Sequence, residues 1–116
     1  MTAADSYDVI IVGAGAAGCA AALSLPPGTR ALLIDRAGRG FERCCGGLLA
    51  PDAQAALLSL GLTLPDEVRV QPEPRSVHVH DLDSGREQTY RRDYLNLDRR
   101  LFDTWLLALA AERVEV

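Results

Sequence analysis

Apolar residues near the start of the chain fall in short blocks whose lengths and spacing predict a strand, a helix and a second strand. The run YDVIIV at 7–12 is continuous and rich in β-branched residues, which is typical of a strand covered on both faces in a parallel sheet. The small residues of GAGAAGCAAALSL favour a helix that ends at Pro26. A second apolar run, RALLIDR, completes a predicted βαβ unit over residues 7–35.

The pattern changes after the second strand. Residues 36–50 are rich in glycine and arginine, contain two adjacent cysteines and predict a loop. Pro51 and Asp52 suit the first turn of a short helix, and Gly61 lies just past its expected end.

The second half of the chain predicts a hairpin and a helix. Two strands are expected over residues 75–92, around a turn at Asp83-Ser84-Gly85. A helix is expected over residues 98–112, with Asp98 as its N-cap and apolar residues at helical spacing. The final RVEV is typical of the opening of another strand.

Composition and charge narrow the class of protein. The 116 residues are 48% hydrophobic and 24% charged with a net charge of -4, which suits one modest globular domain. A mildly acidic chain is not expected to bind nucleic acid independently of sequence, because such binding requires a basic face. The start lacks the layout of a signal peptide, and no apolar run approaches the roughly 20 residues needed to span a bilayer. We therefore expect a cytoplasmic protein, with peripheral membrane association left open.

The three cysteines do not predict a disulfide framework or a metal site. Cys44 and Cys45 are adjacent and point apart, and His78 and His80 share a strand face without a third ligand, so no metal is expected. A disulfide between neighbouring cysteines would close a strained ring. Cys19 is expected to be a small buried residue.

A glycine pattern carries the strongest chemical signal. Gly13, Gly15 and Gly18 form G-x-G-x-x-G directly after a predicted strand and at the opening of a helix. Gly13 permits the tight turn, Gly15 lets a pyrophosphate approach the backbone, and Gly18 allows the helix to pack close to the strands. The predicted phosphate-binding residues are Gly13, Ala14, Gly15, Ala16, Ala17 and Gly18.

An acidic residue completes the pattern. Asp35 ends the second strand, where a carboxylate accepts hydrogen bonds from the hydroxyls of an adenosine ribose and repels a 2′-phosphate. Arg36 follows it and is a further candidate contact, with a solvated charge as the alternative. Together these residues predict dinucleotide binding.

Four segments give a more specific resemblance: YDVIIVGAGAAGCAAA, LLIDR, RCCGGLLAPDA and LNLDRRLFDTWLL. Together they resemble the N-terminal part of the geranylgeranyl reductase family, within the FAD-dependent oxidoreductases similar to para-hydroxybenzoate hydroxylase. The resemblance covers nearly the whole chain. Its C-G-G and R-x-x-F-D-x-x-L motifs are more selective than the glycine fingerprint.

The resemblance implies FAD as cofactor, with its ribose at Asp35 and its pyrophosphate over the glycine turn. Cys45, Gly46 and Gly47 match the C-G-G loop, which in this family lies close to the flavin and the substrate. Bare glycine backbone can approach a flat ring and donate hydrogen bonds to it. Cys45 is a candidate for tuning substrate position, and no general acid or base can be named.

Two arginines are implied as cofactor-side residues. Arg43 matches a basic position ahead of the C-G-G loop, and Arg99 matches the arginine of R-x-x-F-D-x-x-L, with Arg100 as the neighbouring candidate. Arginine at a helix start is disfavoured by the helix dipole, so a bound anion would explain Arg99. Cys44 departs from the family, since many relatives carry another residue there, commonly proline, which implies a less rigid loop in this chain.

The resemblance implies an α/β fold: a Rossmann-like βαβ FAD-binding domain of the GR2 type, with an inserted antiparallel hairpin. Residues 1–116 are expected to be the N-terminal part of an FAD/NAD(P)-binding domain, in which 36–50 is the flavin-side loop. One βαβ unit leaves a parallel sheet with unpaired edges, so we expect this chain to be a fragment of a longer protein.

The leading functional hypothesis is an FAD-dependent oxidoreductase that reduces a C=C bond of a prenyl or similarly apolar small molecule, with NAD(P)H as a candidate electron donor. An FAD-dependent monooxygenase is the close alternative. A non-catalytic or truncated dinucleotide-binding module and a nicotinamide-only dehydrogenase stay open as further hypotheses.

Overall fold

The computed structural model describes residues 6–36 and 45–116 of the chain. The chain divides into two compact units. Met1–Cys44 with Phe102–Val116 is called the N-terminal unit, and Cys45–Leu101 is called the central unit. Within the described ranges, no helix combines the length and the apolar character needed to cross a membrane.

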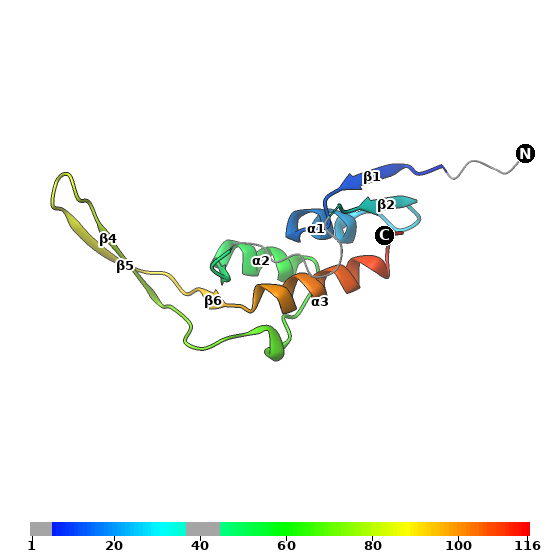
Figure 1. Ribbon diagram of the computed structural model, residues 1–116. Coiled ribbons are helices and arrows are strands. Elements are labelled where there is room, and N and C mark those ends of the chain that lie inside the picture. The colour runs from blue at the N-terminus through cyan, green and yellow to red at the C-terminus, as the bar shows by residue number, and fades with distance from the viewer. Residues whose placement is uncertain (1–5, 37–44) are drawn as a thin grey trace, which may run out of the picture. The chain divides into compact units, whose positions relative to one another are not determined.

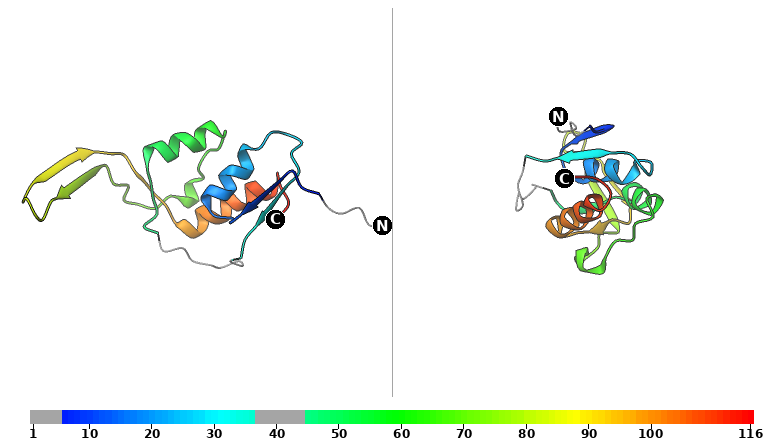
Figure 2. Two further views of the ribbon diagram at one scale, coloured as in Figure 1. Left: turned by 90° about the horizontal axis from the view of Figure 1, so that it is seen from above. Right: turned by 90° about the vertical axis from the view of Figure 1, so that its right-hand side faces the viewer.

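The N-terminal unit contains the predicted βαβ arrangement. Strand β1 (Val9–Val12) is followed by helix α1 (Ala16–Ser24) and strand β2 (Ala31–Ile34). The two strands are parallel, with Val9 opposite Ala31 and Val12 opposite Ile34. Figures 1 and 2 show α1 lying along the two strands. The α/β prediction for this part of the chain is confirmed.

Helix α1 covers one face of this sheet. Ile11 lies on that face, where its Cγ2 is close to Gly18 of α1, and its partner Leu33 is almost fully buried. The opposite face is open, since Ile10 is 58% and Val12 84% exposed. The prediction that the first strand is covered on both faces is therefore wrong for the described residues, because only one helix packs on these two strands.

The end of the chain returns to the same sheet. Glu115 forms a parallel bridge with Leu32, in which Leu33 N donates to Glu115 O at 2.8 Å and Glu115 N donates to Ala31 O at 3.1 Å. Glu115 of RVEV therefore lies at the edge of β2, at the position of a third parallel strand. Arg113 Nη1 also donates to the carbonyl of Leu23 in the last turn of α1, at 3.3 Å.

Helix α3 (Arg99–Ala111) carries the apolar stripe expected from its sequence. Phe102, Leu106 and Ala110 are buried in the N-terminal unit, and the Phe102 and Trp105 rings lie 5.8 Å apart. Asp98 caps the helix as predicted, since its Oδ1 accepts a hydrogen bond from Leu101 N at 3.0 Å.

The central unit begins with a short pairing that the sequence pattern missed. Strand β3 (Leu48–Leu49) pairs antiparallel with strand β6 (Leu95–Asn96). The expectation that all of residues 36–50 form a loop is therefore wrong at 48–49. Two-residue strands have no periodicity of their own, so only the distant partner strand defines them.

Helix α2 (Pro51–Ser59) follows β3 with Pro51 in its first turn, as predicted. It ends in a tight turn in which Gly61 has φ +73° and Leu62 N donates to Leu57 O at 3.0 Å. A single 3₁₀ turn, η1 (Asp66–Val68), comes next.

Strands β4 (Ser76–His80) and β5 (Glu87–Arg91) form the predicted antiparallel hairpin, visible as a two-stranded ribbon in Figures 1 and 2. The Asp81 carboxylate closes its tip by accepting hydrogen bonds from Asp83 N at 3.0 Å and Ser84 N at 3.3 Å. Gly85 then takes φ +68°. The inserted hairpin is confirmed.

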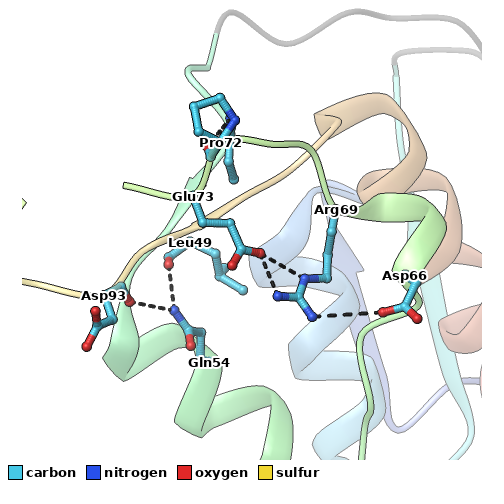
Figure 3. Close-up of polar contacts among 8 residues, drawn as sticks. Leu49, Gln54, Asp66, Arg69, Pro72, Glu73 and Asp93 are labelled. Carbon is cyan, nitrogen blue, oxygen red and sulfur yellow. Dashed lines mark hydrogen bonds and ion pairs between the residues drawn. The ribbon is translucent and has the colours of Figure 1, made fainter. Parts of the chain in front are cut away.

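Side-chain contacts tie the connecting segments of the central unit together (Figure 3). Gln54 Nε2 donates to the carbonyls of Leu49 and Asp93, at 2.9 and 3.1 Å. Arg69 donates through Nε and Nη2 to one oxygen of Glu73, at 2.9 and 2.6 Å. These contacts hold the segments on either side of the hairpin close to α2 and η1.

Candidate functional site

The predicted phosphate-binding turn lies at the carboxyl end of the parallel strands. Gly13 has φ +107°, a conformation that side chains rarely adopt, which explains glycine at the strand-to-helix turn. Its N–H donates to the carbonyl of Ile34 at 2.6 Å. The turn is therefore joined directly to the end of β2.

Gly18 makes the turn compact. A Cβ atom at this position would overlap the carbonyl oxygen of Gly13 and lie 3.4 Å from Cγ2 of Ile11. The absence of a side chain therefore allows α1 to pack against the turn and strand β1, which is the role that the sequence predicted for this glycine.

The first turn of α1 is suited to an anion. Gly15 is the N-cap, has an extended conformation and makes no side-chain cap hydrogen bond, and the first turn contains no acidic residue. The N–H groups at a helix start lack partners within the helix and carry the positive end of its dipole. Ala16 and Ala17 present only methyl groups. A diphosphate therefore fits this end of α1.

Asp35 and Arg36 are exposed just beyond β2. Because Gly13 N–H binds the carbonyl of Ile34, the residue before Asp35, the structure brings the glycine turn and the acid together. Ala14, another predicted contact, is buried, and its carbonyl accepts a hydrogen bond from Cys19 Sγ at 3.5 Å.

The C-G-G loop belongs to the central unit, and its two glycines differ. Gly46 is exposed, and a Cβ built there would meet nothing within 4 Å. Gly47 is buried with φ +75°, and a Cβ there would overlap the carbonyl oxygen of Leu97. Cys45 is an exposed thiol.

A backbone hydrogen bond connects this loop to the segment just before α3. Leu97 N donates to Gly47 O at 2.8 Å, and Arg99 is the first residue of α3 and half-buried. Cys45–Gly47 and Arg99, the arginine of the second motif, therefore belong to the same unit, with Arg99 two residues after the partner of Gly47. Arg43 and Cys44 lie outside the described residues, so their predicted roles stay predictions.

A leucine-lined cavity in the central unit was missed at the sequence level. It has a volume of about 140 Å³ and lies beside β3, β6 and α2. Its lining consists of Leu49, Gln54, Leu57, Leu58, Leu62, Leu64 and Leu95. The dense leucines of residues 57–64 were its signal in the sequence, but only the β3–β6 pairing adds the opposite wall.

No group of three or more metal-ligating side chains occurs in the part of the chain that the structure describes. The two histidines instead contact the facing strand of the hairpin: His78 Nδ1 lies 2.9 Å from Thr89 Oγ1, and His80 Nδ1 lies 3.0 Å from Glu87 Oε1. Cys19 is 1% exposed, as expected for a small core residue.

Known proteins share this sequence pattern. The sequence model of a family described as FAD binding domain matches residues 8–69, more than half of the chain. Protein CbrA of Escherichia coli (strain K12) and protein CbrA of Shigella sonnei (strain Ss046) are each 39% identical over 116 residues, covering 97% of this chain and 33% of theirs. The chain thus spans about a third of the length of these curated relatives.

A solved structure shares the fold. The crystal structure of a geranylgeranyl bacteriochlorophyll reductase-like protein from Thermoplasma acidophilum matches with a TM-score of 0.76 at 24% identity, covering 95% of this chain and 29% of that one. This likeness confirms the Rossmann-like α/β fold expected from the sequence. Together with the family match, which includes β1, the glycine turn, α1 and β2, it leads to one conclusion: this chain belongs to the FAD binding domain family.

Proposed function

We propose that this chain is the cofactor-binding portion of an FAD-dependent oxidoreductase. The observation that carries the proposal is the 2.6 Å hydrogen bond from Gly13 N to Ile34 O, because it sets the glycine turn beside Asp35. One dinucleotide then contacts both: its diphosphate meets the amides of α1, and its adenosine ribose meets the Asp35 carboxylate.

The residues of the N-terminal unit would bind and orient the cofactor. Gly13 and Gly15 leave the entry to α1 without side chains, Ala16 and Ala17 add only methyl groups, and Gly18 lets the helix pack on the turn, so the backbone N–H groups can donate to phosphate oxygens. Arg36 lies next to the acid and would contribute a positive charge near the diphosphate. FAD, when bound, supplies the redox chemistry of its isoalloxazine ring.

Residues of the central unit would serve the ring side of the cofactor. Gly46 offers exposed backbone that a flat ring can approach, and Arg99 would face a bound anion from the start of α3. Arg43 is proposed for the same role ahead of the loop. Cys45, as an exposed thiol, is proposed to tune substrate position.

The proposed reaction is reduction of a C=C bond in an apolar, prenyl-like small molecule, with NAD(P)H as a candidate electron donor. The leucine-lined cavity supports an apolar substrate, because its volume of about 140 Å³ suits a small hydrocarbon group and six of its seven lining residues are leucines, Gln54 being the other. The name of the matching structure, a geranylgeranyl bacteriochlorophyll reductase-like protein, points to the same substrate class. A monooxygenase is the second candidate, since an apolar cavity suits either reaction.

Because the chain spans only about a third of its curated relatives, the activity, substrate and donor of the whole protein are all part of the proposal. The cytoplasmic location and the peripheral membrane association stay predictions.

The test is a titration of the purified chain with FAD, followed by flavin fluorescence, for the wild type, Asp35→Ala and Asp83→Ala. Asp83→Ala is the control, because Asp83 is an exposed acid at the hairpin tip and its replacement removes the same charge as Asp35→Ala. Loss of hydrogen bonds to a charged acceptor is expected to weaken FAD binding about 10- to 100-fold for Asp35→Ala. Asp83→Ala should bind like the wild type.

Three results would count against the proposal. Equal FAD affinity of Asp35→Ala and wild type would remove the ribose assignment. A wild-type chain that binds NADH but no FAD would favour a nicotinamide-only dehydrogenase, and binding of FAD by a longer protein that shows no redox turnover would favour a non-catalytic module.

A further inference from the structure

We propose that Gly47 is a positioning residue for the flavin: its contact with Leu97 holds the Cys45–Gly46 segment and the start of α3 in one fixed register. This inference rests on the proposed function, and it separates the two glycines of the C-G-G loop. Gly46 is the residue that a ligand can approach, while Gly47 sets where that approach occurs.

Two independent features require glycine at position 47. Its φ of +75° is a left-handed conformation that favours glycine, and it is buried. A Cβ atom would also overlap the Leu97 carbonyl oxygen and lie 3.6 Å from Oδ1 of Asn96. Any other residue would have to push the Leu97 backbone, just after β6, away.

The contact continues into the arginine of the second motif. Leu97 N donates to Gly47 O at 2.8 Å, so Gly47 and Leu97 are joined by a hydrogen bond as well as by close packing. The next residue, Asp98, is held on both sides: its N–H donates to Val68 O at 2.9 Å, and its carboxylate caps Leu101 N at 3.0 Å. Arg99 follows immediately.

This chain of short contacts leaves little freedom between the loop and the helix start. Leu97 is 6% and Val68 3% exposed, so the hydrogen bonds are shielded from water. Displacing Gly47 by the width of a methyl group would therefore change the position of Gly46 relative to Arg99. Two groups that serve one ligand must be held within a fraction of an ångström to act together.

Gly85 offers a matched control. It has φ +68°, close to that of Gly47, but a Cβ atom there would meet nothing within 4 Å. Gly47→Ala and Gly85→Ala therefore carry a similar left-handed strain, and only Gly47→Ala displaces a neighbour.

The experiment compares wild type, Gly47→Ala and Gly85→Ala for folding by circular dichroism, FAD affinity, the absorbance spectrum of bound flavin and its midpoint potential. We expect Gly85→Ala to match the wild type. Folded Gly47→Ala is expected to bind FAD at least about 10-fold more weakly and to shift the flavin spectrum and potential, which a loss of stability alone would not do.

If Gly47→Ala folds and has the same FAD affinity, flavin spectrum and midpoint potential as the wild type, the inference is wrong and the proposed function is unaffected. A wild-type chain that binds no FAD would instead overturn the proposed function. If Gly47→Ala does not fold, the chain can be assembled by ligation at Cys45 with the Leu97 amide replaced by an ester. This removes the hydrogen bond to Gly47 and weakens the Asn96 carbonyl as acceptor of Val70 N, so an ester at Val70, which removes only the Val70 N–H, is the control. An unchanged FAD affinity and flavin spectrum in the Leu97 ester variant would also overturn the inference, and a weakened affinity with a shifted spectrum would support it.

Discussion

Gly18 packs directly against Gly13, so closely that a Cβ atom at position 18 would overlap the Gly13 carbonyl oxygen. The last glycine of the motif therefore supports the first one, and the turn and the helix form one rigid corner. The spacing of G-x-G-x-x-G is required here by packing within the protein, independently of any ligand.

Gly18→Ala is expected to destabilise the chain by about 2 kcal/mol, because the added methyl group must push α1 away from the turn. Urea unfolding of the 116-residue chain measures this change. FAD binding should weaken in parallel, since the first turn of α1 moves with the helix.

Gly46→Ala is the control for this prediction. A Cβ at Gly46 meets nothing within 4 Å, so its stability should stay within about 0.5 kcal/mol of the wild type. Equal stability of Gly18→Ala and Gly46→Ala would show that α1 adapts to the methyl group and that the corner is not rigid.

The Arg69–Glu73 pair is expected to stabilise the central unit measurably. Two guanidinium nitrogens contact one Glu73 oxygen, and the Glu73 side chain is only 17% exposed. A double-mutant cycle with Arg69→Ala and Glu73→Ala should give a coupling energy of about 1 kcal/mol by urea unfolding.

The pair formed by Arg91 and Asp93 serves as comparison. Its side chains are 77% and 58% exposed, so the same cycle should give roughly 0.3 kcal/mol or less. A coupling for Arg69–Glu73 no larger than this would contradict the prediction that partial burial strengthens the contact.

The hairpin tip is expected to be sensitive to acid. The Ser84 hydroxyl, together with the N–H groups of Ser84 and Asp83, donates to the Asp81 carboxylate and lowers its pKa from the ordinary value of 3.8. Because the folded pKa lies below the unfolded one, this stabilisation is fully present above the ordinary value and is lost as the pH falls through the lowered pKa.

An NMR titration of the Ser84 amide signal checks this. The signal should move when the pH falls below the ordinary range of an aspartate, and Asp81→Asn should abolish that transition. A transition at or above the ordinary pKa of Asp81 in the wild-type chain would be inconsistent with the hydrogen-bonded turn.

Local sequence patterns were sufficient to predict several elements of the fold. The strand β1, the glycine turn and helix α1 follow from residues that contact one another within a few positions, and the hairpin follows from two alternating segments around Asp83-Ser84-Gly85. The Asp98 cap was also predictable, because a capping side chain bonds an amide only three residues away.

Other features depend on residues far apart in the chain. The pairing of Leu48–Leu49 with Leu95–Asn96 has no local signal, and it is this pairing that makes Gly47 a buried contact of Leu97 and completes the leucine cavity. The open face of β1 could not be predicted either. An apolar run indicates that a strand is suited to burial, but it does not indicate which elements cover each face. The physical reason is the same in each case: propensity and periodicity report interactions over a few residues, whereas the free energy of long-range packing chooses partners that the pattern does not specify.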